Sequence, residues 1–520
     1  MDAFSNLYVG FSIALSFQNL LYCFMGCLVG TVIGVLPGIG PVSTIAILIP
    51  FTFSMNPTTA LILLAGVYYG AMYGGSTTSI LVNVPGESAS IMTCLDGYQM
   101  ARQGRAKSAL ATAAIGSFFA GTMGAIAFMF LAVPISKLGL KFAPPEYFAL
   151  MLLALTMVSA LSAGSPIKGI FMTILGLLLA TIGTDLQTGQ IRFTFGQVHL
   201  MEGVHFIVVA IGMFGVAEVL SEAEKIWQFG LGGDRQRIAG QYWITWNELK
   251  QSFMPYVRGT ILGFFIGVLP GTGGTTATFL SYGLEKQISK HPETFGKGAI
   301  EGVAGPEAAN NASSEGAMIP LLTLGIPGSA TTAIMLGAFV MIGLKPGPLL
   351  FENNSDLVWA IIASLYIGNV MLLVLNLPLV NLFAKILDLP RAVLQSSVLA
   401  FCVLGVYSVN FAVPDVFVMV LFGIIGYFAH KHHYPVAPLL LALVLGDMME
   451  QGFRRSLAIS NGDWSIFVTR PITLVILIAV VFSLAYSTIK FYRRRPEVKE
   501  SHAQRFKGKP FECNRNLVKK

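Results

Sequence analysis

Charged residues are scarce in this chain of 520 residues. Only 11% of the residues are Asp, Glu, Lys or Arg, while 54% are hydrophobic and the mean hydropathy is +0.70. A soluble protein carries roughly 25% charged residues, so this chain has too few to cover a surface that faces water. Apolar stretches near the roughly 20 residues that span a bilayer recur throughout. The expected fold class is an all-α polytopic membrane protein.

Motifs for nucleotide use and familiar hydrolytic chemistry are also missing. The sequence has no G-x-x-x-x-G-K-[ST] loop, no G-x-S-x-G elbow and no H-E-x-x-H pair. These motifs cradle phosphates, expose a nucleophilic serine and hold zinc, respectively. The five cysteines show no metal-site spacing, so neither disulfides nor structural zinc are supported. We therefore expect no cofactor in the usual sense and no enzyme of these classes.

The sequence contains one motif that occurs twice, once in each half of the chain. Residues 26–40 read GCLVGTVIGVLPGIG and residues 259–273 read GTILGFFIGVLPGTG. Each copy opens with two overlapping GxxxG steps, which let a neighbouring helix approach closely. Each ends in Leu-Pro-Gly-x-Gly, where proline removes an amide and glycine permits unusual backbone angles. Two interrupted apolar segments at corresponding places in two halves point to the binding site of a transporter.

The two halves stay parallel in sequence beyond this string. The pairs Pro85-Gly86 and Pro327-Gly328 correspond at an offset of 242 residues. The loop at 96–107 is basic, whereas its counterpart at 344–356 carries Lys345 with Glu352 and Asp356. By the positive-inside rule these loops face opposite sides of the membrane, which favours an inverted repeat with broken or re-entrant helices at its centre. A parallel repeat stays open.

The same rule predicts the division of the chain. Basic residues in the long polar stretch between the halves and in the C-terminal segment point to the cytoplasm. We expect a first membrane repeat at 1–221, a cytoplasmic linker at 222–255, a second membrane repeat at 256–490 and a cytoplasmic tail at 491–520.

Four clusters combine helix-breaking residues with small polar ones. A helix broken inside the membrane offers free N–H groups to an anion and free carbonyls to Na⁺, and hydroxyl and amide side chains can complete both sites. Small residues could instead serve tight packing alone, but broken backbone in a bilayer needs a further reason. The residues predicted to bind substrate are Gly38, Gly40, Ser43, Thr44, Ser76, Thr77, Thr78, Gly271, Gly273, Thr275, Thr276, Asn310, Asn311, Ser313, Ser314 and Ser329.

Three side chains are candidate cation ligands: Asn83, Glu87 and Glu315. Carboxylates inside a membrane are costly and usually functional, so the two glutamates could ligate a cation or relay protons. A position at the membrane surface or a helix cap is the alternative, particularly for Glu87, which follows Pro-Gly. We assign Glu307 to a solvated loop.

The repeated Gly-Val-Leu-Pro-Gly segments, Tyr-Gly-Gly-Ser-Thr-Thr-Ser-Ile-Leu at 73–81 and Gly-Pro-Glu-Ala-Ala-Asn-Asn-Ala at 305–312 resemble a known family. The chain is similar to the large membrane subunit of the bacterial tripartite tricarboxylate transporters over roughly 10–490. The resemblance implies a secondary importer of citrate-like carboxylates in the bacterial inner membrane, driven by a cation gradient. It also implies two partners, a small membrane subunit and a periplasmic substrate-binding protein.

The coupling ion is not fixed by the resemblance. Neutral oxygens outnumber carboxylates in the clusters, so we expect Na⁺, with a proton-coupled permease as the alternative. An anion channel and an intramembrane enzyme are further alternatives, and dicarboxylates or aromatic carboxylates remain open as substrates. Nucleic acid is not an expected partner, because the basic groups flank membrane segments.

Overall fold

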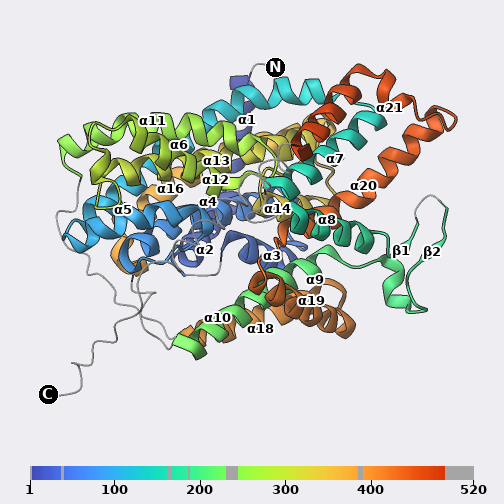
Figure 1. Cartoon of the computed structure of the whole chain (residues 1–520), viewed down its shortest axis with the longest axis horizontal. Helices are drawn as coiled ribbons and strands as arrows, with labels where there is room; N and C mark the ends of the chain where they lie inside the picture. Colours follow the sequence, from blue (N-terminus) through green and yellow to red (C-terminus); the bar gives the residue numbers. More distant parts are fainter. Residues whose placement is uncertain are drawn as a thin grey trace, which may run out of the picture.

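The apolar segments fold as helices because in a bilayer a helix satisfies every backbone donor and acceptor within itself. The computed structural model describes residues 3–36, 40–161, 166–185, 188–229, 244–384 and 391–485 (Figure 1). The predicted all-α polytopic class is confirmed. Five described helices are long and apolar enough to cross a membrane: Phe17–Val35, Ala106–Gly139, Phe206–Glu224, Ser355–Asn376 and Val413–Lys431.

The first repeat begins after a short N-terminal helix, α1 (Ala3–Ala14). Its two breaks separate α2 from α3 and α4 from α5, and a single turn, η1, precedes α5. The elements of this repeat are α2 (Phe17–Val35), α3 (Pro41–Thr52), α4 (Pro57–Val82), η1 (Ser88–Ser90), α5 (Ile91–Arg102) and α6 (Ala106–Gly139).

The second repeat has the same order of long helices and breaks. One break separates α11 from α12 and the other separates α13 from α14. Its elements are α11 (Trp246–Val268), α12 (Gly273–Ile288), η4 (Pro292–Thr294), α13 (Glu301–Leu324), α14 (Ala330–Met341), α15 (Pro348–Asn353) and α16 (Ser355–Asn376).

Close backbone contact holds the long helices of each repeat together, as the GxxxG steps predict. A Cβ on Gly26 would overlap the carbonyl oxygen of Leu63, and a Cβ on Gly259 would overlap that of Gly305. The same holds one and two turns further along in both repeats, so α2 packs on α4 as α11 packs on α13. Only glycine permits this approach.

Equivalent helices of the two repeats run in opposite directions. Ser76 of α4 donates to Glu307 of α13 over 2.6 Å, and Tyr69 donates to Glu315 over 3.2 Å. A later residue of α4 thus meets an earlier residue of α13, which makes the pair antiparallel. The repeat is therefore inverted.

The remaining helices follow α6 in the first half of the chain and α16 in the second. A π-helical turn, η3, joins α9 to α10, and a two-residue antiparallel ribbon pairs Gly183 with Arg192 and Thr184 with Ile191. Figure 1 shows α10, α18 and α19 grouped along one edge of the molecule. The elements are α7 (Pro144–Leu161), α8 (Pro166–Ala180), β1 (Gly183–Thr184), β2 (Ile191–Arg192), η2 (Val198–Glu202), α9 (Phe206–Ala210), η3 (Ile211–Val216), α10 (Ala217–Phe229), α17 (Val380–Ala384), α18 (Arg391–Asn410), α19 (Val413–Lys431), α20 (Ala437–Ile459), α21 (Ile466–Thr469) and a further apolar helix at Pro471–Ala485.

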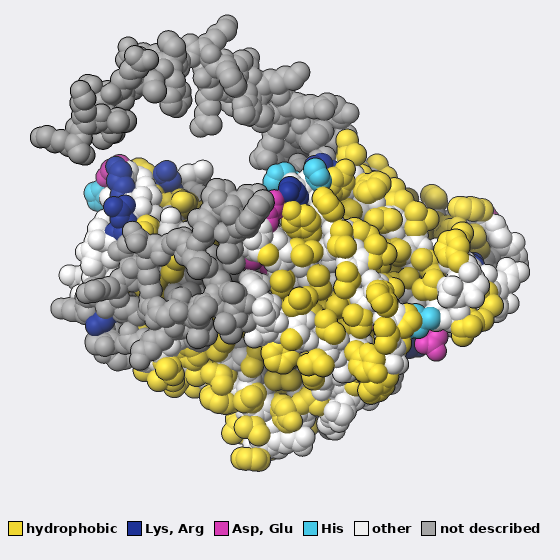
Figure 2. Space-filling model, turned by 90° about the horizontal axis from the view of Figure 1, so that it is seen from below, with side chains coloured by type: hydrophobic (Ala, Val, Ile, Leu, Met, Phe, Trp, Pro, Cys, Tyr) yellow, Lys and Arg dark blue, Asp and Glu magenta, His cyan; other side chains and the backbone are white. Residues whose placement is uncertain are grey.

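The outer surface of these helices is apolar. Figure 2 shows hydrophobic side chains over most of the described part of this face, with charged side chains gathered near its edges. Large exposed side chains such as Phe401, Leu404, Phe417 and Leu421 belong to α18 and α19. A surface of this kind is suited to lipid.

A carboxylate ties the two repeats together at the end of the molecule where α6 begins. Asp96 of α5 is fully buried, and its Oδ1 accepts backbone N–H groups from Gly296, Gly298 and Ala299, each over 2.8 Å. Its Oδ2 accepts the hydroxyl of Tyr282 over 2.8 Å. Gly296 and Gly298 have positive φ, a conformation that lets successive N–H groups converge on one anion. We call this contact the Asp96 clasp.

Two predicted parts of the chain fall partly or wholly outside the described residues. Helix α10 extends into the predicted linker and α11 begins within it, while 230–243 are not described. The predicted tail at 491–520 is likewise outside the described residues.

Candidate functional site

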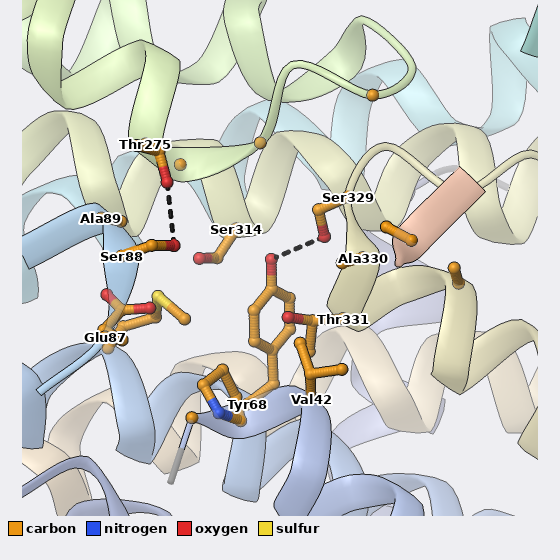
Figure 3. Close-up of a pocket in the computed structure, with 18 of the residues that line it drawn as sticks. Val42, Tyr68, Glu87, Ser88, Ala89, Thr275, Ser314, Ser329, Ala330 and Thr331 are labelled. Carbon is orange, nitrogen blue, oxygen red and sulfur yellow. Dashed lines mark hydrogen bonds between the residues drawn. The ribbon is translucent and has the colours of Figure 1, made fainter. Parts of the chain in front are cut away.

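The four breaks meet around one cavity at the centre of the molecule. The cavity has a volume of about 430 Å³ and receives residues from both repeats (Figure 3). Its lining includes the first residues of α3, η1, α12 and α14, so four helical segments begin at its wall. The lining residues are Gly40, Pro41, Val42, Tyr68, Met72, Pro85, Gly86, Glu87, Ser88, Ala89, Val158, Glu218, Gly271, Gly273, Gly274, Thr275, Ser314, Ser329, Ala330, Thr331, Ala333, Ala437 and Leu441.

The electrostatics of this wall suit an anion that enters together with a cation. Each helix N-terminus carries roughly half a positive charge on its unpaired N–H groups. The lining residues, all in the described part of the chain, include Glu87 and Glu218 but no Lys, Arg or His. Helix ends are thus the cavity's positive groups, and two carboxylates oppose them.

Residues related by the repeat face each other across the cavity. The offset of 242 residues pairs Glu87 with Ser329 and Tyr68 with Asn310. Asn310 Nδ2 donates to Glu87 Oε1 over 2.8 Å, and the hydroxyls of Tyr68 and Ser329 share a hydrogen bond of 3.4 Å. In Figure 3 Glu87 and Ser329 lie on opposite sides of the cavity. One side therefore carries a carboxylate that the amide of Asn310 binds from behind the wall, and the other carries two hydroxyls.

Glu87 and Ser329 occupy equivalent positions, each at the N-cap of the helical segment that begins after its break. Glu87 occupies the N-cap position of η1, where its backbone N–H and C=O both bond the hydroxyl of Ser90, and the Ser329 hydroxyl caps α14 by accepting the N–H of Thr332. The residue that ends the preceding long helix is left-handed in both repeats, Asn83 with φ of 58° and Gly325 with φ of 72°. The helix-cap reading of Glu87 and its position at the cavity are therefore compatible.

One hydrogen bond crosses between the repeats at the cavity wall. Thr275 of α12 donates to Ser88 of η1 over 2.9 Å, as Figure 3 shows. This contact joins the start of a second-repeat helix to the start of a first-repeat helix.

Behind the cavity lies a second polar layer that does not line it. Glu307 accepts hydroxyl protons from Ser76 and Thr93, and Asn311 donates to Ser117 over 2.7 Å. Glu307 is 1% exposed inside α13, so its assignment to a solvated loop is wrong. The polar stretch that suggested a loop is instead helical because its small residues pack against α6, α11 and α12.

The structure brings some predicted site residues to the cavity and leaves others behind it. Those at the wall are Gly40, Gly271, Gly273, Thr275, Ser314, Ser329 and Glu87. Those elsewhere are Ser43, Thr44, Ser76, Thr77, Thr78, Thr276, Asn310, Asn311, Ser313, Asn83 and Glu315. Gly38 lies outside the described residues.

Several of these residues satisfy helix backbone or other side chains. Ser43 donates to Phe214 O over 3.2 Å, Thr44 donates to Gly40 O over 3.1 Å, and Thr78 donates to Val35 O. Asn83 is an exposed helix end, and Glu315 accepts from Tyr69.

Sequence reasoning missed the lining residues that come from outside the clusters. Tyr68 and Met72 lie in an apolar part of α4, and Val158, Glu218, Ala437 and Leu441 come from α7, α10 and α20. Tyr68 could have been predicted from the sequence, because the offset of 242 residues relates it to Asn310, which was a predicted site residue. Val158, Glu218, Ala437 and Leu441 could not, because they lie outside the strings that the two halves visibly share.

No metal cluster of the familiar kind occurs in the described part of the chain. Groups of three or more His, Cys, Asp or Glu side chains that could hold a metal are not found there. A cation bound near the cavity would therefore use amide, hydroxyl and carbonyl oxygens together with fewer than three such side chains.

Comparison with known proteins identifies a family of transporters. The family model described as "Tripartite tricarboxylate transporter TctA family" matches residues 20–441. An uncharacterised 52.8 kDa protein in the TAR-I ttuC' 3' region of Agrobacterium vitis is 49% identical over 477 residues, which cover 92% of this chain and 94% of that protein. An uncharacterised protein in the TAR-II ttuC' 3' region of the same organism is 47% identical over 215 residues, which cover 41% of this chain and 89% of that protein. No solved structure matches this chain.

Proposed function

Because the chain belongs to the tripartite tricarboxylate transporter TctA family, we propose that it is the carboxylate-translocating subunit of a Na⁺-coupled importer. The substrate is a small organic carboxylate, by default a tricarboxylate such as citrate. The chain works in the bacterial inner membrane with a small membrane subunit and a periplasmic substrate-binding protein.

The observation that carries this proposal is the charge of the central cavity. Four helical segments begin at its wall, and Lys, Arg and His are absent from its lining in the described chain. The four helix starts together supply roughly two positive charges, and Glu87 and Glu218 oppose them. A substrate with two or three carboxylates therefore needs more positive charge than the wall supplies. A cation that enters with the substrate provides that charge, and the two ligands then raise each other's affinity reciprocally.

The inverted repeat supports a transport cycle rather than catalysis or open conduction. In transporters with such repeats the substrate lies at the repeat interface, and each side of the membrane gains access in turn. The cavity of this chain lies at such an interface, and its wall offers hydroxyl, amide and backbone groups.

Proton coupling is the second candidate, and buried carboxylates favour it. Glu307 and Glu315 are 1% and 2% exposed and lie close to the cavity in α13. A carboxylate in such a place can carry a proton through a membrane protein.

The test is uptake of labelled citrate by proteoliposomes that contain this chain and its two partner proteins. We expect saturable uptake that requires an inward Na⁺ gradient at constant pH. Uptake that follows an imposed pH gradient without Na⁺, and that Glu315→Gln or Glu307→Gln abolishes, would establish the proton-coupled alternative. Flux that does not saturate would indicate a channel, and chemical conversion of the citrate would indicate an enzyme.

A further inference from the structure

One polar atom beside the cavity has no hydrogen-bond partner. Asn310 is 1% exposed, and its Oδ1 is buried and unpaired although its Nδ2 donates to Glu87 over 2.8 Å. An unpaired buried oxygen costs about 1–3 kcal/mol. The amide nitrogen is held by the Glu87 carboxylate, which leaves the unpaired oxygen suited to bind a cation.

A second oxygen faces the same point. A Cβ on Gly274 would lie 3.0 Å from Asn310 Oδ1 and 3.1 Å from Ser313 Oγ. Ser313 gives its proton to the backbone oxygen of Asn310 over 2.7 Å, so the lone pairs of its hydroxyl remain available. Gly274 itself lines the cavity at the start of α12, and a side chain there would press against these two oxygens and against the Cβ of Ala89, 3.1 Å away.

We propose that Asn310 Oδ1, Ser313 Oγ and the Glu87 carboxylate form a cation site beneath Gly274. The ligand is a hard monovalent cation such as Na⁺, because one carboxylate with neutral oxygens balances a single positive charge. The proposal rests on the proposed function and specifies where its coupling ion binds.

The inverted repeat explains why the site occurs once. On the opposite side of the cavity, Asn310 is replaced by Tyr68 and Glu87 by Ser329, and both replacements are hydroxyl groups. Hydroxyls can donate to a carboxylate, and the start of α14 adds its unpaired N–H groups there. The cavity is therefore polarised, with the cation on the Glu87 side and a substrate carboxylate on the Ser329 side.

The test measures Na⁺ binding to the purified full-length chain without relying on transport. A ligand that binds only the folded state raises its thermal midpoint, so Na⁺ should stabilise the protein relative to K⁺ at equal ionic strength. We expect Asn310→Ala and Gly274→Ala each to raise the Na⁺ concentration for half of this effect by at least about tenfold. Asn310→Ala removes a ligand oxygen, whereas Gly274→Ala fills the space of the ion. The two variants therefore weaken Na⁺ binding for different reasons.

Asn369→Ala is the matched control. Asn369 is also a buried asparagine, but its amide has partners on both atoms, Tyr73 on Oδ1 and Phe118 O on Nδ2. Its removal should lower the midpoint in every salt and change the half-effective Na⁺ concentration by less than about twofold, because no cation ligand is lost.

Two results would overturn the site. One is a wild-type Na⁺ response that persists in both Asn310→Ala and Gly274→Ala, and the other is citrate uptake by a wild-type protein that Na⁺ does not stabilise. The opposite pattern, an Asn310-dependent Na⁺ response without uptake of any carboxylate, would leave the site standing and refute the proposed function.

Discussion

Single residues at the breaks are constrained by conformation and by space. Gly271 has φ of +78°, and a Cβ there would lie 2.6 Å from the Cα of Val158. An L side chain pays roughly 1–2 kcal/mol for left-handed backbone even where space is free. Gly271 thus sets both the path of the chain at the cavity and the approach of α7.

The first prediction at this scale concerns Gly271→Ala. We expect this variant to lose at least about 2 kcal/mol of unfolding free energy, since strain and overlap with α7 add. Thermal unfolding in detergent and Na⁺-driven citrate uptake measure the two effects, and we expect uptake to be lost.

Gly283→Ala provides the comparison for Gly271→Ala. Gly283 is helical, and a Cβ there meets nothing within 4 Å. This variant should be neutral or up to about 1 kcal/mol more stable, because alanine favours the helix. Equal behaviour of the two variants would show that the backbone at 271 is not constrained.

Secondary-structure elements are joined across the repeats by polar contacts, of which the Asp96 clasp is the most complete. Its carboxylate accepts four hydrogen bonds from the connection between α12 and α13 and from Tyr282. Nearby, Glu248 at the start of α11 pairs with Arg105 over 2.7 Å. Burial opposes the charge of Glu248, but hydrogen bonds from Arg105, Thr245 and Ser108 prevail and lower its pKa to about 2.

The second prediction is that Asp96→Asn loosens this end of the molecule. Charge-assisted hydrogen bonds contribute about 1.5–3 kcal/mol, and the amide would also place donors against donors. Hydrogen exchange at 289–300 should become faster and the thermal midpoint should fall.

Glu293→Gln tests whether any lost charge in this connection has the same effect. Glu293 and its partner His291 are 66% and 73% exposed, so their ion pair contributes little. We expect unchanged exchange in this variant. If hydrogen exchange at 289–300 accelerated by the same factor in both variants, the hydrogen bonds of Asp96 would not be what stabilises this connection.

The sequence predicts the elements of each repeat better than their surroundings. The GxxxG steps and the Pro-Gly pairs give the breaks, because backbone chemistry at those residues is local. The burial of Glu307 was missed, since polar residues in α13 are covered by other helices that local pattern does not reveal. Glu218 and Val158 reach the cavity only through the packing of α7 and α10, which is a tertiary event.

At the scale of the whole molecule, α6 separates two sets of connections. Arg105 immediately precedes the helix, while Ser136 near its other end donates to Pro348 O over 3.3 Å. At 1.5 Å per residue, the 34 residues of α6 extend about 50 Å, enough to cross a bilayer. The predicted loops at 96–107 and 344–356 are partly helical, since α5 runs to Arg102 and α15 spans Pro348–Asn353. The two segments lie at opposite ends of α6.

The third prediction is that these loops face opposite compartments. Cysteines at Gly104 and Gly343, where a Cβ meets no neighbour, should be labelled from opposite sides of the membrane. Both positions have positive φ, so each cysteine costs roughly 1–2 kcal/mol of stability. The native cysteines must first be replaced, and four of them are buried. A reagent that cannot cross the membrane should reach position 343 from the periplasm and position 104 only after permeabilisation. Equal labelling of both from the periplasm would contradict this topology.

The Asp96 clasp also makes the two halves energetically unequal. The residue that corresponds to Asp96 in the second repeat is Ala338, which is apolar and buried. The first-repeat connection between α3 and α4, moreover, is shorter than the one that Asp96 grips. If the repeats exchange conformations during a cycle, the exchanged state has no equivalent contact. Every 1.4 kcal/mol of that difference changes the ratio of the two conformations about tenfold. Without ligands the protein therefore populates mainly the conformation in which the Asp96 clasp is formed, and its cavity opens mainly to one side of the membrane.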